Sequence, residues 1–148
     1  MMWKLFLSIS LPVFLSCSLL RGYKKREFVY GNDDKTLALL IPSGYSKEET
    51  RTDSLGNKER VYHYRNGASL YFARTMVVKD MQPIDKQNNI PLAHPYGGLM
   101  YKGLDERGLY WREMQRNGFR FGYKNVPSNW EIKFDSSVNY AGYQRVRR

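Results

Sequence analysis

Cysteine and histidine are scarce in this sequence of 148 residues, and their scarcity excludes several kinds of site. Cys17 is the only cysteine, so no intramolecular disulfide can form. His63 and His94 lie about 30 residues apart, without the short spacing that is typical of zinc ligands. Phosphate-binding glycine-rich loops and serine-nucleophile motifs are missing as well. We therefore expect no metal, no cofactor and no enzymatic activity.

Acidic residues are outnumbered: 14 Asp and Glu stand against 24 Lys and Arg, and the formal net charge is +10. This excess favours anionic neighbours such as lipid headgroups, acidic glycans or an acidic protein. It is equally consistent with a charge that only keeps the domain soluble. Hydrophobic residues make up 42% of the chain, which is enough for a packed core and excludes global disorder.

The N-terminus carries the most specific pattern in the chain. Lys4 precedes an apolar run of signal-peptide length, residues 5–15. The end of this run overlaps the motif Phe14-Leu15-Ser16-Cys17. These four residues resemble the lipobox of bacterial lipoproteins, although Phe14 and Leu15 depart from its commonest form, which has Leu first and a small residue second. The resemblance covers residues 1–17. It implies cleavage after Ser16, acylation of Cys17 with chains such as palmitate, and a membrane anchor in the bacterial cell envelope, facing the periplasm or the exterior.

Two alternatives to the lipoprotein interpretation stay open. Residues 5–20 could form an uncleaved transmembrane helix, but 16 residues are fewer than the roughly 20 that a bilayer requires, and Pro12 interrupts them. The run could instead be a strand or helix of a cytosolic protein. Basic residues at 21 and 24–26 follow the run, and the positive-inside tendency would keep that segment in the cytoplasm. The shortness of the run nevertheless favours the lipoprotein.

The remaining sequence predicts one small domain of the α+β class. We expect an antiparallel sheet of about five to seven strands with one or two helices packed on one face. The predicted divisions are a signal peptide over 1–16, a lipidated cysteine with a basic tether over 17–27, the domain over 28–142 and a basic tail over 143–148.

Local patterns place the elements of this domain. Asn-Gly pairs at 66–67 and 117–118 predict two hairpins, with strands over 59–64 and 68–75 and over 109–115 and 119–124. Further strands are expected over 28–30, 36–41 and 99–102, and the apolar run 36–41 is predicted to be central in the sheet. Ser46 and Glu49 fit a capping box, which predicts a short helix over 47–53. Residues 129–140 predict a C-terminal amphipathic helix.

The second hairpin carries the candidate binding residues. A possible surface for an anionic ligand consists of Arg112, Arg116, Arg120, Lys124, Tyr110 and Trp111. A two-residue turn pairs residue 116 with 119 and residue 112 with 123, which divides the four bases between the two faces of the hairpin. This division predicts a weak, salt-screened attraction rather than one strong polybasic site. The alternative is an ordinary core face backed by a solvated basic face.

The aromatic strand 118–123 is similar to the base-stacking strand of RNA-recognition modules. Asn117, Arg120 and Gly122 stand where such a strand has basic, small and aliphatic residues, so we expect no nucleic-acid partner. The expected function is a membrane-anchored envelope lipoprotein, more suited to binding or envelope assembly than to catalysis. The alternative is a small periplasmic enzyme with a cleft under the loop 79–98, where His94 or nearby carboxylates would act as acid and base.

Overall fold

The computed structural model describes residues 22–29, 36–52, 54, 56–74, 92–93, 99–116 and 118–143. The strands are β1 (Tyr23–Val29), β2 (Thr36–Pro42), β3 (Tyr45–Thr52), β4 (Lys58–Tyr64), β5 (Ser69–Ala73), β6 (Leu92–Ala93), β7 (Leu99–Leu104), β8 (Tyr110–Arg116) and β9 (Phe119–Val126). A 3-10 turn, η1 (Ser128–Trp130), leads into the helix α1 (Glu131–Tyr143).

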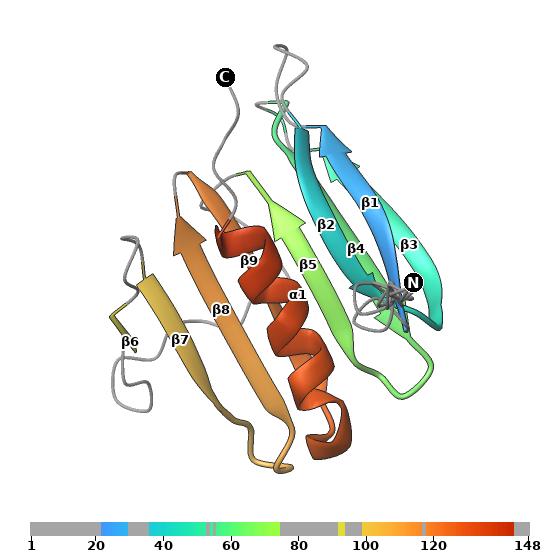
Figure 1. Cartoon of the computed structure of the whole chain (residues 1–148), viewed down its shortest axis with the longest axis vertical. Helices are drawn as coiled ribbons and strands as arrows, with labels where there is room; N and C mark the ends of the chain where they lie inside the picture. The colour runs from blue at the N-terminus through green and yellow to red at the C-terminus, as the bar shows by residue number, and fades with distance from the viewer. Residues whose placement is uncertain are drawn as a thin grey trace, which may run out of the picture.

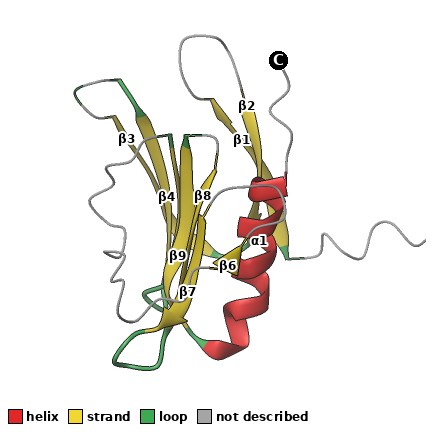
Figure 2. Ribbon diagram, turned by 90° about the vertical axis from the view of Figure 1, so that its left-hand side faces the viewer, coloured by secondary structure: helices red, strands yellow, loops and turns green. Residues whose placement is uncertain are grey.

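These elements form two layers. Seven strands make an antiparallel sheet in the order β3-β4-β5-β9-β8-β7-β6, and β1 and β2 form a separate antiparallel pair. Figures 1 and 2 show this pair and α1 side by side over one face of the large sheet. The predicted α+β class, with an antiparallel sheet and a helix on one face, is confirmed.

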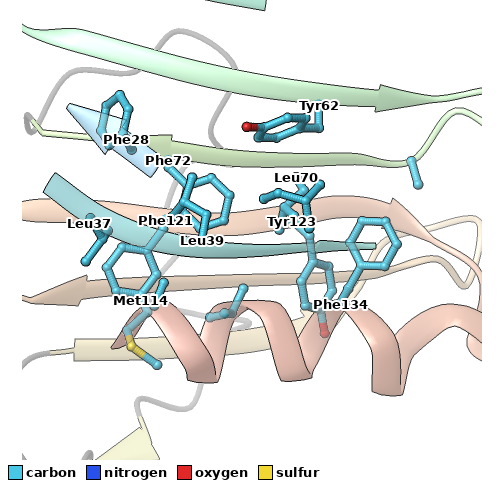
Figure 3. Close-up of a cluster of buried hydrophobic side chains, with 14 of the residues drawn as sticks. Phe28, Leu37, Leu39, Tyr62, Leu70, Phe72, Met114, Phe121, Tyr123 and Phe134 are labelled. Carbon is cyan, nitrogen blue, oxygen red and sulfur yellow. The ribbon is translucent and has the colours of Figure 1, made fainter. Parts of the chain in front are cut away.

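The main core fills the space between the layers. Alternate residues of the large sheet point toward α1 and the β1–β2 pair, as the two-residue period of a strand requires. Figure 3 shows this cluster, which includes Phe28, Leu37, Leu39, Tyr62, Leu70, Phe72, Met114, Phe121, Tyr123 and Phe134. Aromatic rings dominate it and meet mostly edge to face, the arrangement that their quadrupoles favour; the rings of Tyr123 and Phe134, for example, lie 5.6 Å apart.

Both predicted hairpins are confirmed. The turn after Tyr64 places Gly67 at φ 85°, a conformation that glycine adopts without strain, and β5 returns along β4. The second hairpin pairs Arg116 with Phe119 and Arg112 with Tyr123, which is the register that the two-residue turn predicted. The predicted strand over 99–102 is confirmed as part of β7, and the C-terminal helix as α1.

A bulge in β9 was not foreseen. Lys124 and Asn125 together lie opposite Trp111, because the pairing shifts between Tyr110 and Arg112. Asn125 has a positive φ of 57°, a conformation that Asn tolerates better than most residues. The extra residue turns Val126 toward the helix side, where it is fully buried in the main core.

The helix predicted over 47–53 is wrong, because residues 47–52 belong to β3. β3 pairs with β4 along its length, from Tyr45 opposite Tyr64 to Thr52 opposite Lys58. A helix of about two turns hardly repays its costly nucleation, whereas hydrogen bonds to β4 satisfy the backbone along the whole strand. Tertiary pairing therefore overrides the local capping pattern.

The apolar segment 36–41 is a strand, as predicted, but it is not central in the large sheet. β2 belongs to the two-stranded sheet and lies between β1 and α1 in the layer that covers the large sheet. Leu39 faces the main core, and Leu40 on the opposite side is also buried. The burial of Leu39 therefore comes from packing against the large sheet and not from a central place in that sheet.

The domain begins earlier than predicted. Residues 23–27, expected in a basic tether, pair with β2 as the first part of β1. Arg26 donates a hydrogen bond to the Tyr45 hydroxyl at 3.1 Å, and the Lys24 ammonium lies 5.3 Å from the centre of the same ring. Both basic side chains therefore contact Tyr45 of β3. The signal peptide, Cys17 and residues 144–148 of the predicted tail lie outside the described residues.

Candidate functional site

The structure divides the predicted anionic-ligand residues between two faces. The register puts Arg112 and Arg116 on the side of α1, and Arg120 and Lys124 on the opposite side. Tyr110 packs against the main core, and Trp111 lies over Gly103 of the neighbouring strand. The six residues therefore do not share one surface, as the two-residue turn implied.

On the helix side, Arg112 is buried in a cluster that joins β8 to α1. Its guanidinium donates hydrogen bonds of 2.7 Å to both Asp135 Oδ1 and Asn139 Oδ1. Asp135 also accepts a hydrogen bond of 2.8 Å from the Tyr123 hydroxyl and one of 3.0 Å from Lys102 Nζ. Only 6% of the Arg112 side chain is exposed, so this base is not presented to a ligand.

The charges of this cluster compensate one another. Lys102 contacts Glu131 as well as Asp135, so two bases face two acids. Burial alone would raise the pKa of Asp135, but the Lys102 ammonium and the Arg112 guanidinium outweigh it, and the pKa is lowered from its usual 3.8. Burial raises the pKa of the neighbouring Tyr123 hydroxyl. This arrangement is typical of a structural clamp between helix and sheet.

A second buried ion pair lies on the opposite side of the sheet. Glu113, next to Arg112 in the sequence, is completely buried and forms a two-point ion pair with Arg120. Gln115 donates a further hydrogen bond of 3.1 Å to Glu113 Oε1. The guanidinium of Arg120 is thus held by its own hairpin, as Arg112 is held by the helix.

Tyr71 also belongs to this second cluster, and its hydroxyl lies beside Gly122, where no side chain is in the way. The two residues are opposite each other on β5 and β9, and the Tyr71 hydroxyl donates to the Arg112 carbonyl oxygen at 3.5 Å. A Cβ atom at residue 122 would overlap that carbonyl oxygen and crowd the tyrosine hydroxyl. Glycine is required here because the Arg112 carbonyl group and the Tyr71 hydroxyl occupy the space that a Cβ atom would need. Burial raises the pKa of Tyr71 well above its usual value.

The chemistry of a metal site is not present in the described part of the chain, where no group of three or more His, Cys, Asp or Glu side chains converges. His63 lies on β4 with its Nε2 atom 3.3 Å from Glu49 Oε2. Hydrogen bonds from Arg51 and Lys47 lower the pKa of Glu49 to about 2. Lys47, Glu49 and Arg51 form a partly exposed charge ladder on the edge strand β3, an arrangement that discourages pairing with other chains.

The predicted cleft under 79–98 falls largely outside the described residues. Only Leu92–Ala93 of that stretch is described, as β6 at one edge of the large sheet, and His94 is not. The enzyme alternative therefore stays a prediction.

A feature that sequence reasoning missed lies where the described chain begins. Figure 1 shows the start of β1 at the same end of the molecule as the turns 43–44, 65–67 and 105–109 and the first turn of α1. We call this the Tyr23 end. Two large apolar side chains are exposed there, Leu104 at 57% and Ile132 at 79%. The only sequence signal was the place of Ile132 on the helix away from the stripe of Phe134 and Val138.

Comparison with protein-family models, with curated proteins and with solved structures gave no match. No helix among the described residues, α1 included, is long and apolar enough to cross a membrane.

Proposed function

We propose that this protein is a bacterial envelope lipoprotein, anchored through an acylated Cys17, whose α+β domain serves binding or envelope assembly rather than catalysis. The lipobox-like N-terminus is the origin of this proposal. The observation that supports it most is the short distance along the chain between Cys17 and the first strand.

Only residues 18–22 separate Cys17 from Tyr23, where β1 begins. An extended residue spans at most about 3.6 Å, so the six steps from Cys17 to Tyr23 reach no farther than about 22 Å. Acylation of Cys17 would therefore hold the domain directly against a bilayer. A mature protein of this kind needs no long tether, and the basic residues 24 and 26 remain part of the fold.

The pairing of the buried acids with arginines of the same domain supports binding rather than catalysis. Asp135 and Glu113 are each held by arginines of the same domain, and each pair links structural elements. Acid–base catalysis instead needs a titrating group placed to exchange a proton with a substrate. The exposed bases then supply the means to meet an anionic lipid, a glycan or an acidic protein.

Metabolic labelling tests the anchor directly. Bacteria expressing the full chain would be grown with an alkyne fatty acid, and label on the protein would be measured after gel separation. We expect label on the natural sequence and on the control Ser10→Ala, but none on Cys17→Ser, because only the last removes the acceptor sulfur. Equal label on all three would contradict the proposal.

A further inference from the structure

The Tyr23 end has the composition of a surface that contacts lipid headgroups. Ile132 projects from the first turn of α1 with 79% of its surface exposed. Beside it, the Lys133 ammonium lies 5.7 Å from the centre of the Trp130 ring. An exposed aliphatic side chain next to a half-buried tryptophan and a lysine is the combination found where proteins meet a membrane interface.

This patch is joined to the start of the described chain. The Tyr23 hydroxyl donates a hydrogen bond of 3.4 Å to the Lys133 carbonyl oxygen, across β2. The Trp130 ring packs edge-on against Tyr64 at 5.6 Å, and exposed Arg65 follows directly in the next turn. The apolar patch and its neighbouring bases therefore lie around the point where residues 1–21 join the domain.

The length and character of the preceding chain indicate what covers this patch. The apolar-rich segment 5–20, which is the possible transmembrane helix, ends only two residues before Gly22. With either anchor, acyl chains on Cys17 or an uncleaved membrane helix, the bilayer would lie within a few residues of Tyr23. Exposed Lys25, Arg65 and Lys133 complement the negative surface of a bilayer that contains anionic lipid.

We infer that the Tyr23 end rests on an anionic bilayer, with Ile132 and Trp130 at headgroup level and Arg65 and Lys133 against lipid phosphates. The inference rests on the proposed function, because it takes the membrane anchor as given. It adds the orientation of the domain: the opposite ends of the strands, including Thr36, face away from the membrane. Any partner would then meet those distal ends.

Site-specific fluorescence tests this orientation. The full chain carrying Ile132→Cys would be labelled with a polarity-sensitive dye and reconstituted into vesicles of phosphatidylethanolamine and phosphatidylglycerol. Thr36→Cys is the matched control, because Thr36 is also exposed and lies at the other end of β2, six residues or about 20 Å from Pro42, the partner of Tyr23. The natural sequence, labelled in parallel, reports whether the Cys17 thiol is free.

We expect the dye at position 132 to shift to shorter wavelength on reconstitution and to be quenched by nitroxide-labelled lipid, with no change at position 36. Vesicles that retain the protein while both positions stay in water would overturn the orientation and leave the anchor intact. A protein that carries a labelled Cys17 and does not float with vesicles would instead contradict the anchor, and the orientation with it.

Discussion

The bases of the β8–β9 hairpin and those of the Tyr23 end are used in opposite ways. Arg112 and Arg120 have side chains that are 6% and 13% exposed, and each is bound to a carboxylate of the same domain. Arg65 and Lys133 are exposed to solvent. The density of basic residues along the hairpin therefore does not mark a ligand surface. Burial, rather than sequence clustering, separates structural bases from those that can meet a partner.

The reason lies in the cost of taking a charge out of water. A buried guanidinium is tolerated only where an acid and further hydrogen bonds replace its hydration. The strand period places the neighbours Arg112 and Glu113 on opposite sides of the sheet, so each recruits its own partner: Asp135 from α1 and Arg120 from β9. One hairpin thereby stabilises both faces.

Removal of β1 is expected to have the largest effect on the domain. A fragment of residues 28–148 lacks Tyr23–Glu27, and with them the strand that covers the edge of β2. We expect this fragment to lose its cooperative thermal transition, because domains of this size are stable by only about 5–15 kcal/mol. A fragment of residues 22–148, with or without Lys25→Ala at an exposed position, should melt cooperatively. Equal melting of the 22–148 and 28–148 fragments would show that β1 is dispensable.

Loss of the Asp135 carboxylate in the helix-side cluster should have the second-largest effect on stability. Asp135→Asn leaves the buried Arg112 without its acid, and we expect the free energy of unfolding to fall by about 3 kcal/mol in urea denaturation. Glu106→Gln, the same change at an exposed turn, is the control and should have little effect. The double variant Arg112→Met with Asp135→Asn should be less destabilised than Asp135→Asn alone. Stability of Asp135→Asn equal to that of the control would contradict the clamp.

Acid should weaken the same clamp to a smaller degree. The pKa of Asp135 is lowered in the folded state, so its contribution to stability is fully present above the unfolded value near 3.8 and is lost as the pH falls toward the folded value. Between pH 5 and pH 2 the natural sequence should therefore lose more stability than Asp135→Asn. Unfolding curves at several pH values measure this difference, and parallel slopes for the two proteins would exclude a folded-state shift at Asp135.

Neutralising the exposed bases should have the smallest effect on stability. Arg65→Gln and Lys133→Gln each remove a charge that is already in water, and we expect the free energy of unfolding to change by less than about 0.5 kcal/mol. A loss as large as that of Asp135→Asn would mean that the Tyr23 end also uses its bases structurally, and the contrast between the two regions would fail.

The elements that the sequence predicted correctly are those with local signals. Asn66-Gly67 and Asn117-Gly118 each sit between β-rich runs, and the spacing of Phe134 and Val138 predicted the helix. The predictions failed where the outcome depended on distant partners: β3 pairs with β4, and β1 extends over residues 23–27 because β2 lies beside it. The division of the four hairpin bases followed from the turn, but the acids that bind Arg112 and Arg120 are set by the packing of α1 and by strand parity.

The intact mass of the protein, recovered from the membrane fraction of the bacteria that make it, tests the lipid anchor most directly. We expect a chain whose first residue is Cys17, heavier than the same unmodified chain by the mass of its acyl groups. A chain that still carries residues 1–16 and no added mass, or a protein found only in the soluble fraction, would contradict the lipid anchor on which the proposed function depends.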